Sequence, residues 1–104
     1  MRIAINLGCI VILTGIAAWA ADAKAGQAVY ARACQSCHGP TGAGVPAAAK
    51  MLKAEIHDLK VAVKGKSDED IREIIVKGKG KMVATKGVAG ADIDNVIAYV
   101  HTLK

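Results

Sequence analysis

The chain has 104 residues and a formal net charge of +5, from 14 Lys and Arg against 9 Asp and Glu. That length accommodates one domain at most, which excludes a multidomain architecture. The basic charge is not interleaved with aromatic residues, since the chain contains no Phe, 1 Trp and 2 Tyr, so nucleic-acid binding is disfavoured.

The N-terminal segment has the pattern of a secretory signal peptide. Arg2 is followed by an apolar run over Ile3–Ile16, and small residues follow that run. A positive start, an apolar run and an Ala-x-Ala site predict a signal peptide over residues 1–20, with cleavage after Ala20 preferred to cleavage after Ala23.

A retained membrane anchor is the alternative for this segment, because Ile3–Ala21 is about long enough to cross a bilayer. Gly15 and the small residues at the end of the run favour removal by a peptidase. Cys9 would then be discarded with the leader. The sequence therefore predicts a periplasmic domain over residues 21–104 with no membrane span.

The first predicted helix of that domain follows Asp22, a good N-cap residue. Its apolar residues have helical spacing, with Tyr30 alongside: Ala25, Ala28, Val29 and Ala33. Gly26 lies inside this helix at a cost of about 1 kcal/mol relative to Ala. We interpret that glycine as a point where another backbone approaches closely.

Two cysteines remain in the domain, in the stretch ACQSCHGP, where His38 follows Cys37. In an oxidising compartment they allow a disulfide, a redox dithiol, a zinc half-site or thioether attachment. A disulfide between Cys34 and Cys37 would close too small a loop to stabilise the domain much. A redox dithiol would need a preceding strand, where helix is predicted, and zinc lacks a second pair of ligands.

The pentapeptide Cys34–His38 matches C-x-x-C-H, the haem attachment signature of c-type cytochromes. One turn of backbone lets the two thiols reach two neighbouring vinyl groups and brings the next side chain under the iron. We therefore predict one haem c per chain, attached covalently through Cys34 and Cys37, with His38 as an axial ligand. A domain this short also needs a covalent or metal cross-link for stability, because it buries too little of its own surface.

The stretch GPTGAGVPAAAK follows the attachment motif and is expected to wrap the His38 side of the haem. Pro40 is interpreted as ending the attachment helix. Gly42 and Gly44 either let the backbone pass close to the porphyrin or form turns. Beyond them, PAAAKMLK predicts a short helix in which Met51 is a packing residue.

Two further helices are predicted in the second half of the chain, while Leu59–Val63 is the one stretch that could be extended. The earlier helix begins at Ser67 with an approximate capping box to Asp70. It has Ile71, Ile74 and Ile75 inward, Lys77 in its last turn, and Gly78 at its end. The final helix carries Asp92 and Asp94 near its start and the inward residues Ile93, Val96, Ile97, Val100 and Leu103.

Met82 is the predicted sixth ligand of the iron. It lies in GKGKMVATKG, an irregular loop between two predicted helices, where a side chain can point inward without helical periodicity. His57 and His101 are interpreted as surface histidines, solvent-facing or hydrogen-bonded. A thioether ligand raises the reduction potential relative to a second imidazole.

The arrangement resembles the class I monohaem cytochromes c, especially the short bacterial periplasmic ones, over essentially the whole mature chain. The resemblance implies an all-α cytochrome c fold, with three or four short helices around one haem. It implies that the first and last helices cross near Gly26, Tyr30 and Tyr99, and that the Pro46 carbonyl accepts a hydrogen bond from the ligand histidine. Members commonly have Pro directly after the ligand methionine, whereas this chain has Val83, which leaves the loop less rigid.

The function that follows is one-electron transfer by a carrier that is not an enzyme and is expected to be a monomer. Four lysines flank Met82, and a basic rim would steer redox partners with acidic docking surfaces, unless it is only a solubilising cluster: Lys77, Lys79, Lys81 and Lys86. The alternatives are a haem-based sensor with a displaceable sixth ligand and a dedicated electron-transfer subunit of one dehydrogenase or oxidase.

Overall fold

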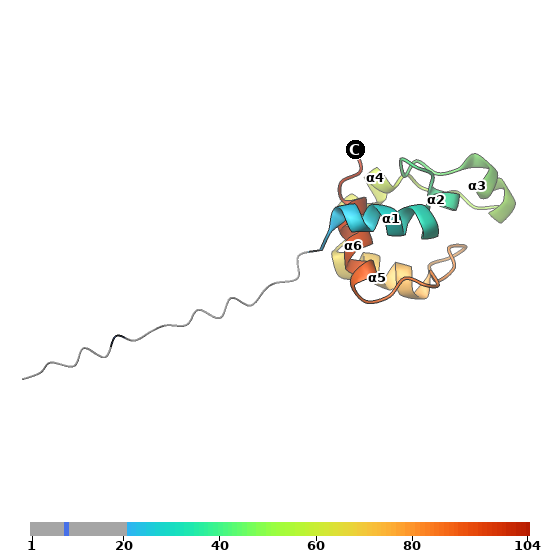
Figure 1. Ribbon diagram of the computed structural model, residues 1–104. Helices are drawn as coiled ribbons and strands as arrows, with labels where there is room; N and C mark the ends of the chain where they lie inside the picture. Colours follow the sequence, from blue (N-terminus) through green and yellow to red (C-terminus); the bar gives the residue numbers. More distant parts are fainter. Residues whose placement is uncertain (1–7, 9–20) are drawn as a thin grey trace, which may run out of the picture.

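The structure is a computed structural model that describes Gly8 and residues 21–104 (Figure 1). The predicted signal peptide over residues 1–20 therefore lies outside the described residues, apart from Gly8. Within the described part of the chain, no helix is long and apolar enough to cross a membrane.

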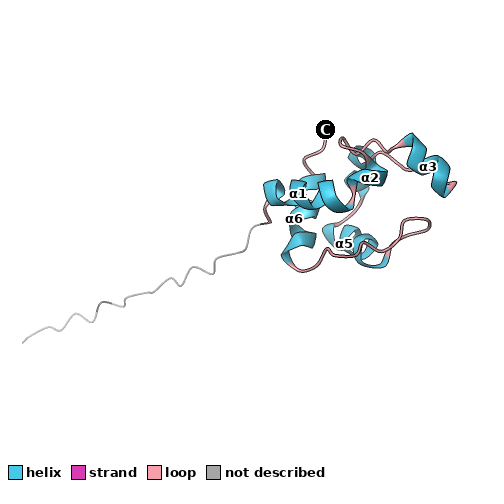
Figure 2. Cartoon of the chain, turned by 45° about the vertical axis from the view of Figure 1, so that its right-hand side comes forward, coloured by secondary structure: helices cyan, strands magenta, loops and turns pink. Residues whose placement is uncertain are grey.

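Residues 21–104 form short helices joined by loops, with no strand among them (Figure 2). The helices are α1 (Ala23–Ala33), α2 (Gln35–His38), α3 (Pro46–Leu52), α4 (Leu59–Ala62), the 3-10 helix η1 (Val63–Gly65), α5 (Asp68–Lys77) and α6 (Ala91–Val100). The predicted all-α fold is thus confirmed, and α1, α3, α5 and α6 correspond to the helices expected from the sequence.

The starts of α1 and α5 are fixed by the capping residues that the sequence indicated. The Asp22 carboxylate accepts hydrogen bonds from the backbone amides of Lys24 and Ala25. Ser67 and Asp70 form a reciprocal capping box at the start of α5. Each cap satisfies amides that have no partner within the helix.

The inward face of α1 differs from the predicted one. Gly26, Val29 and Tyr30 are buried, whereas Ala25 and Ala28 are exposed. The helical period alone did not fix which stripe faces the core, because alanine is compatible with either side. Contact with α6 decided it, since α1 packs against α6 along the stripe that contains Gly26.

The core lies between α1, α5 and α6. Its buried side chains are Val29, Tyr30, Val63, Ile71, Ile75, Val88, Ile93, Val96, Ile97 and Val100. Tyr30 and Tyr99 pack with ring centroids 5.2 Å apart and planes tilted by 57°, an arrangement that aromatic pairs prefer. The predicted meeting of the first and last helices at these rings is confirmed.

The possible extended stretch at Leu59–Val63 is helical instead. Asp58 caps α4 by accepting a hydrogen bond from the Lys60 amide, and η1 continues the turn. The side-chain cap and the local backbone hydrogen bonds favour helix over the extended form.

The helices are arranged so that two branches of the chain extend from the same end of the molecule. In Figures 1 and 2, α2 and α3 form one branch, and the loop between α5 and α6 forms the other. The attachment motif and the predicted sixth ligand belong to these two branches.

Candidate functional site

The two thiols and the imidazole of the motif are held on a single helical turn. Cys34 ends α1, and its amide donates to the Tyr30 carbonyl at 2.9 Å. The amides of Cys37 and His38 both donate to the Cys34 carbonyl, at 3.3 and 3.0 Å. Both cysteines are free thiols and half-buried, so this turn presents two thiols and one imidazole together.

The chain leaving the motif is tied back through three consecutive carbonyl oxygens. The Cys37 carbonyl accepts a hydrogen bond from the Val45 amide at 2.9 Å, and the His38 carbonyl accepts one from the Gly44 amide at 2.8 Å. The Gly39 carbonyl accepts one from the Tyr30 hydroxyl at 2.6 Å. The Tyr30 bond was not predicted from the sequence. Its only sequence signal was an aromatic residue one helical turn before the first cysteine.

Gly42 and Gly44 have the turn-forming role that was one of their two predicted alternatives. Their φ angles are +85° and +94°, which L side chains rarely adopt. Each also meets protein, because a Cβ at Gly42 would contact Leu59 and Leu103, and a Cβ at Gly44 would contact Ile56.

The His38 imidazole is prepared to act as a neutral ligand. Burial lowers the pKa of His38 below its ordinary value, because a buried cation loses hydration. Its Nδ1 atom is buried and has no hydrogen-bond partner among the residues that the structure describes. Pro46 is exposed at the start of α3, and the bond from His38 to the Pro46 carbonyl stays a prediction for the haem-bound protein.

Two other groups beside the motif have shifted acidities. Burial raises the pKa of the Cys34 thiol, and the nearby Arg32 cation partly opposes that change. Burial, with smaller contributions from Cys34 and Tyr99, raises the pKa of Tyr30 to about 12. Tyr30 consequently remains a hydrogen-bond donor throughout the neutral range.

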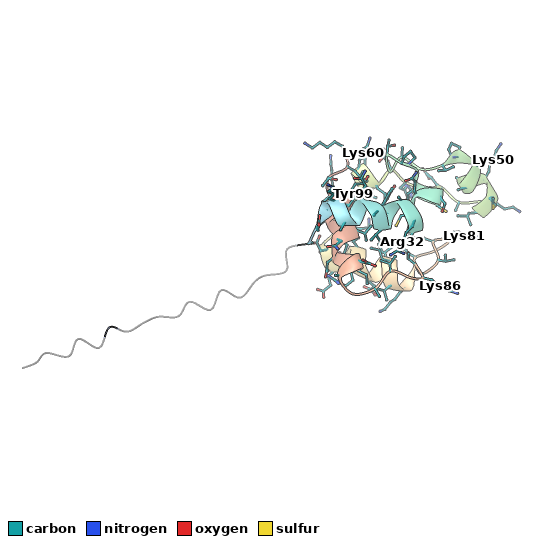
Figure 3. All side chains as sticks on the ribbon, viewed as in Figure 1. Arg32, Lys50, Lys60, Lys81, Lys86 and Tyr99 are labelled. Carbon is teal, nitrogen blue, oxygen red and sulfur yellow. The ribbon has the colours of Figure 1, made fainter. Side chains whose placement is uncertain are left out.

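Met82 lies in a tight turn within the loop between α5 and α6. The backbones of Lys79 and Met82 exchange two hydrogen bonds of 2.9 Å, and Met82 is half-buried. Gly78 allows this closure, because a Cβ there would lie 2.5 Å from the Met82 carbonyl oxygen. Figure 3 shows Lys81 of this loop at the same end of the molecule as Lys50 of α3.

The remaining candidate ligands lie at the surface. Met51 is 82% exposed, so its interpretation as a packing residue is wrong; α3 has no buried residue, which leaves its side chains without a core to join. His57 is exposed beside Glu55, and His101 pairs with Asp68 at 2.6 Å. Both histidines are surface residues, as predicted.

The four lysines around Met82 are all exposed. Lys77 is paired with Glu73 at 3.2 Å, which reduces its contribution to a positive surface. Lys79, Lys81 and Lys86 remain as the basic rim of the Met82 loop, and Figure 3 shows Lys81 and Lys86 along it.

The donor set fits a covalently attached haem and not a zinc ion. Two thiols on one turn are followed by a half-buried imidazole with a lowered pKa, whose buried Nδ1 has no partner among the described residues. This set matches the chemistry of thioether attachment and axial ligation. Within the described residues, no group of three or more His, Cys, Asp or Glu side chains could hold a metal ion by themselves.

This fold and this donor set define a c-type cytochrome of the class I monohaem kind. The chain belongs to the family described as "Cytochrome C oxidase, cbb3-type, subunit III", which matches residues 21–100. Family membership implies haem c, with its iron, as the cofactor, and electron transfer as the general activity.

Curated relatives and solved structures agree with that assignment. The chain is 37% identical to cytochrome c6 of Picosynechococcus sp., over 96% of this chain and 89% of that protein. It is 32% identical to cytochrome c-554(547) of Halothiobacillus neapolitanus, over 82% of this chain and all of that one.

Two solved structures share the fold. The c-type cytochrome named KustC0563 has a TM-score of 0.61 and 25% identity, covering 76% of this chain and 96% of its own. Cytochrome c6 from the diatom Phaeodactylum tricornutum has a TM-score of 0.53 and 31% identity, covering 76% and 90%.

Proposed function

We propose that this protein is an exported, periplasmic one-electron carrier and not an enzyme. Its haem c would be attached through Cys34 and Cys37, with His38 and Met82 as the axial ligands. The observation that carries the proposal is the single turn that presents two thiols and a half-buried imidazole, in a chain of this family.

Haem c, once bound, supplies a centre that takes up and releases one electron. The chain's own residues define how that centre behaves. Burial lowers the pKa of His38, which favours the neutral ring, and the neutral ring has the nitrogen lone pair that binds iron. Met82 would supply a thioether as the second protein ligand of the iron, and an iron with two protein ligands would favour electron transfer over the binding of oxygen or substrate.

Three exposed lysines on the Met82 loop support docking to acidic partners by a monomeric carrier: Lys79, Lys81 and Lys86. Positive charge beside the redox site would speed encounter with anions and make the rate fall with salt. Replacing Lys81 by Gln should slow oxidation by ferricyanide about twofold at low ionic strength without slowing oxidation by cationic tris(phenanthroline)cobalt(III). Lys64→Gln, at an exposed position on η1, is the matched control. An equal fall in the ferricyanide rate in both variants would show that the basic rim is only a solubilising cluster.

A dedicated electron-transfer subunit is the second candidate function, because the matching family is described as a subunit of an oxidase. The two functions differ in their stable assembly. A carrier purifies as a free monomer from its native membrane and periplasmic fractions, whereas a subunit co-purifies with its complex.

The spectrum of the Met82→Ala variant tests the axial ligation. The wild-type protein should carry covalent haem by mass, show the weak long-wavelength absorption of methionine bound to ferric iron, and react slowly with cyanide. Met82→Ala should lose that absorption and bind cyanide quickly. Met51→Ala is the matched control, because Met51 is exposed on α3, and it should behave as the wild type.

Each possible result of this experiment has a definite meaning. A wild-type protein at apoprotein mass contradicts the haem proposal altogether. A wild-type protein with covalent haem and fast cyanide binding contradicts Met82 ligation and favours a haem-based sensor.

A further inference from the structure

Tyr30 contacts the attachment motif on both of its sides. Its backbone carbonyl accepts the Cys34 amide at 2.9 Å, directly before the first thiol. Its hydroxyl donates to the Gly39 carbonyl at 2.6 Å, directly after the imidazole. One residue of α1 is therefore bonded to the two ends of the turn that holds Cys37 and His38.

The hydroxyl bond is buried. Tyr30 is 1% exposed, and its ring packs against the ring of Tyr99. A second donor reaches the Gly39 carbonyl, but it is the Gly42 amide at 3.4 Å, a longer and weaker contact. Loss of the Tyr30 hydroxyl would thus leave the buried Gly39 carbonyl poorly satisfied.

We propose that Tyr30 is a positioning residue, whose hydroxyl fixes the peptide after His38 and thereby orients the imidazole for haem ligation. This inference rests on the proposed function. Within residues 21–104, the carbonyl oxygens of Cys37 and His38 accept only from the backbone amides of Val45 and Gly44. The Tyr30 hydroxyl is the side-chain group that bonds the end of this segment, at the Gly39 carbonyl, to helix α1.

The ring and the hydroxyl of Tyr30 can be separated experimentally. Tyr30→Phe keeps the ring that fills the core between α1 and α6 and removes only the donor. Tyr99→Phe makes the same chemical change in the partner ring, and the hydroxyl of Tyr99 takes part in none of the hydrogen bonds found for residues 21–104. It is therefore the matched control.

Amide hydrogen exchange and paramagnetic NMR of the ferric haem protein provide the test. In Tyr30→Phe, exchange of the Gly44 and Val45 amides should accelerate about tenfold, as expected for the loss of one buried hydrogen bond. The hyperfine-shifted signals of the His38 ring should also move. Tyr99→Phe should leave both measurements at their wild-type values.

Equal results for the two variants would overturn the positioning role, as would a Tyr30→Phe protein that loses only global stability. If Tyr30→Phe does not accumulate, the wild-type protein decides the question. Its Tyr30 hydroxyl proton should exchange slowly and show a nuclear Overhauser contact to Gly39, and a freely exchanging hydroxyl contradicts the inference. Wild-type protein without covalent haem contradicts the proposed function instead, so the two failures are distinguishable.

Discussion

The main-chain carbonyl of Asn95 occupies the space that a Cβ atom would need at Gly26. This contact sets the approach of α1 to α6, which pack together over their length. The side-chain oxygen of Asn95 adds a second link between the two helices, because it accepts a hydrogen bond from the Asp22 amide at 2.8 Å. The close backbone approach predicted at Gly26 is thereby confirmed, and Asn95 is identified as its partner.

Replacing Gly26 by Ala should destabilise the protein by about 3 kcal/mol, because the helices must separate to accept a methyl group. Urea unfolding of the haem protein, followed by circular dichroism, measures the change. Gly65→Ala is the control, since a Cβ there meets nothing within 4 Å. A Gly26 variant as stable as the Gly65 variant would contradict the packing described here.

Replacing Gly78 by Ala should release Met82 from its turn. The new Cβ would overlap the Met82 carbonyl and the Ala84 amide, so the loop must open. The expected result is loss of the long-wavelength absorption assigned above to methionine ligation, with the haem still attached. Two causes of strain act at Gly78, its positive φ and the overlap of a Cβ with Met82. Gly80→Ala is the control that separates them, because Gly80 also has a positive φ, +57°, but a Cβ there meets nothing within 4 Å. Equal loss of the absorption in both variants would show that φ strain alone opens the loop.

Replacing Val83 by Pro should stiffen the Met82 loop. Val83 is 80% exposed, and its amide donates none of the backbone hydrogen bonds found in the loops of residues 21–104. Met82, directly before it, is already in a bridge pairing, which suits the extended backbone that proline imposes on its predecessor. We expect the unfolding free energy to rise by about 0.5–1 kcal/mol and imidazole to displace Met82 from the iron more slowly. Faster displacement of Met82 would contradict the stiffening of the loop.

Lys53 ends α3 in the left-handed conformation, with φ of +50°. A side chain there costs about 1 kcal/mol relative to glycine. Lys53→Gly should therefore raise the midpoint of thermal unfolding, whereas Lys50→Gly inside the same helix should lower it. A fall for both variants would mean that Lys53 makes a favourable contact that outweighs its backbone strain.

Tyr30 should make the folded protein sensitive to alkaline pH. Its pKa is about 12 in the folded protein against an ordinary 10.0, so folding favours the neutral phenol. That contribution to stability is complete below pH 10 and is lost as the pH rises from 10 to 12, up to about 3 kcal/mol.

A titration of the tyrosine Cζ carbon by NMR checks this prediction. In the Tyr99→Phe protein, Tyr30 is the one remaining tyrosine, so the signal is unambiguous. The folded protein should keep the neutral signal through pH 11. Ionisation close to pH 10 would show that the hydroxyl is not buried in its bond to Gly39.

The sequence by itself determined the features that depend on residues close together in the chain. The caps at Asp22 and Ser67, the helical turn of Cys34–His38 and the loop around Met82 all follow from such short-range contacts. They can be predicted because a side chain near a helix end competes for only a few neighbouring backbone groups.

The tertiary structure decided what depends on residues far apart. The exposed Ala25 and Ala28, the exposed Met51, and the bond from Tyr30 to Gly39 each follow from how α1, α3 and the motif pack. Small or flexible apolar side chains fit several environments, and a hydroxyl can reach several carbonyls. Only the packing of distant segments selects one, since periodicity specifies a stripe on a helix and not the neighbour that covers it.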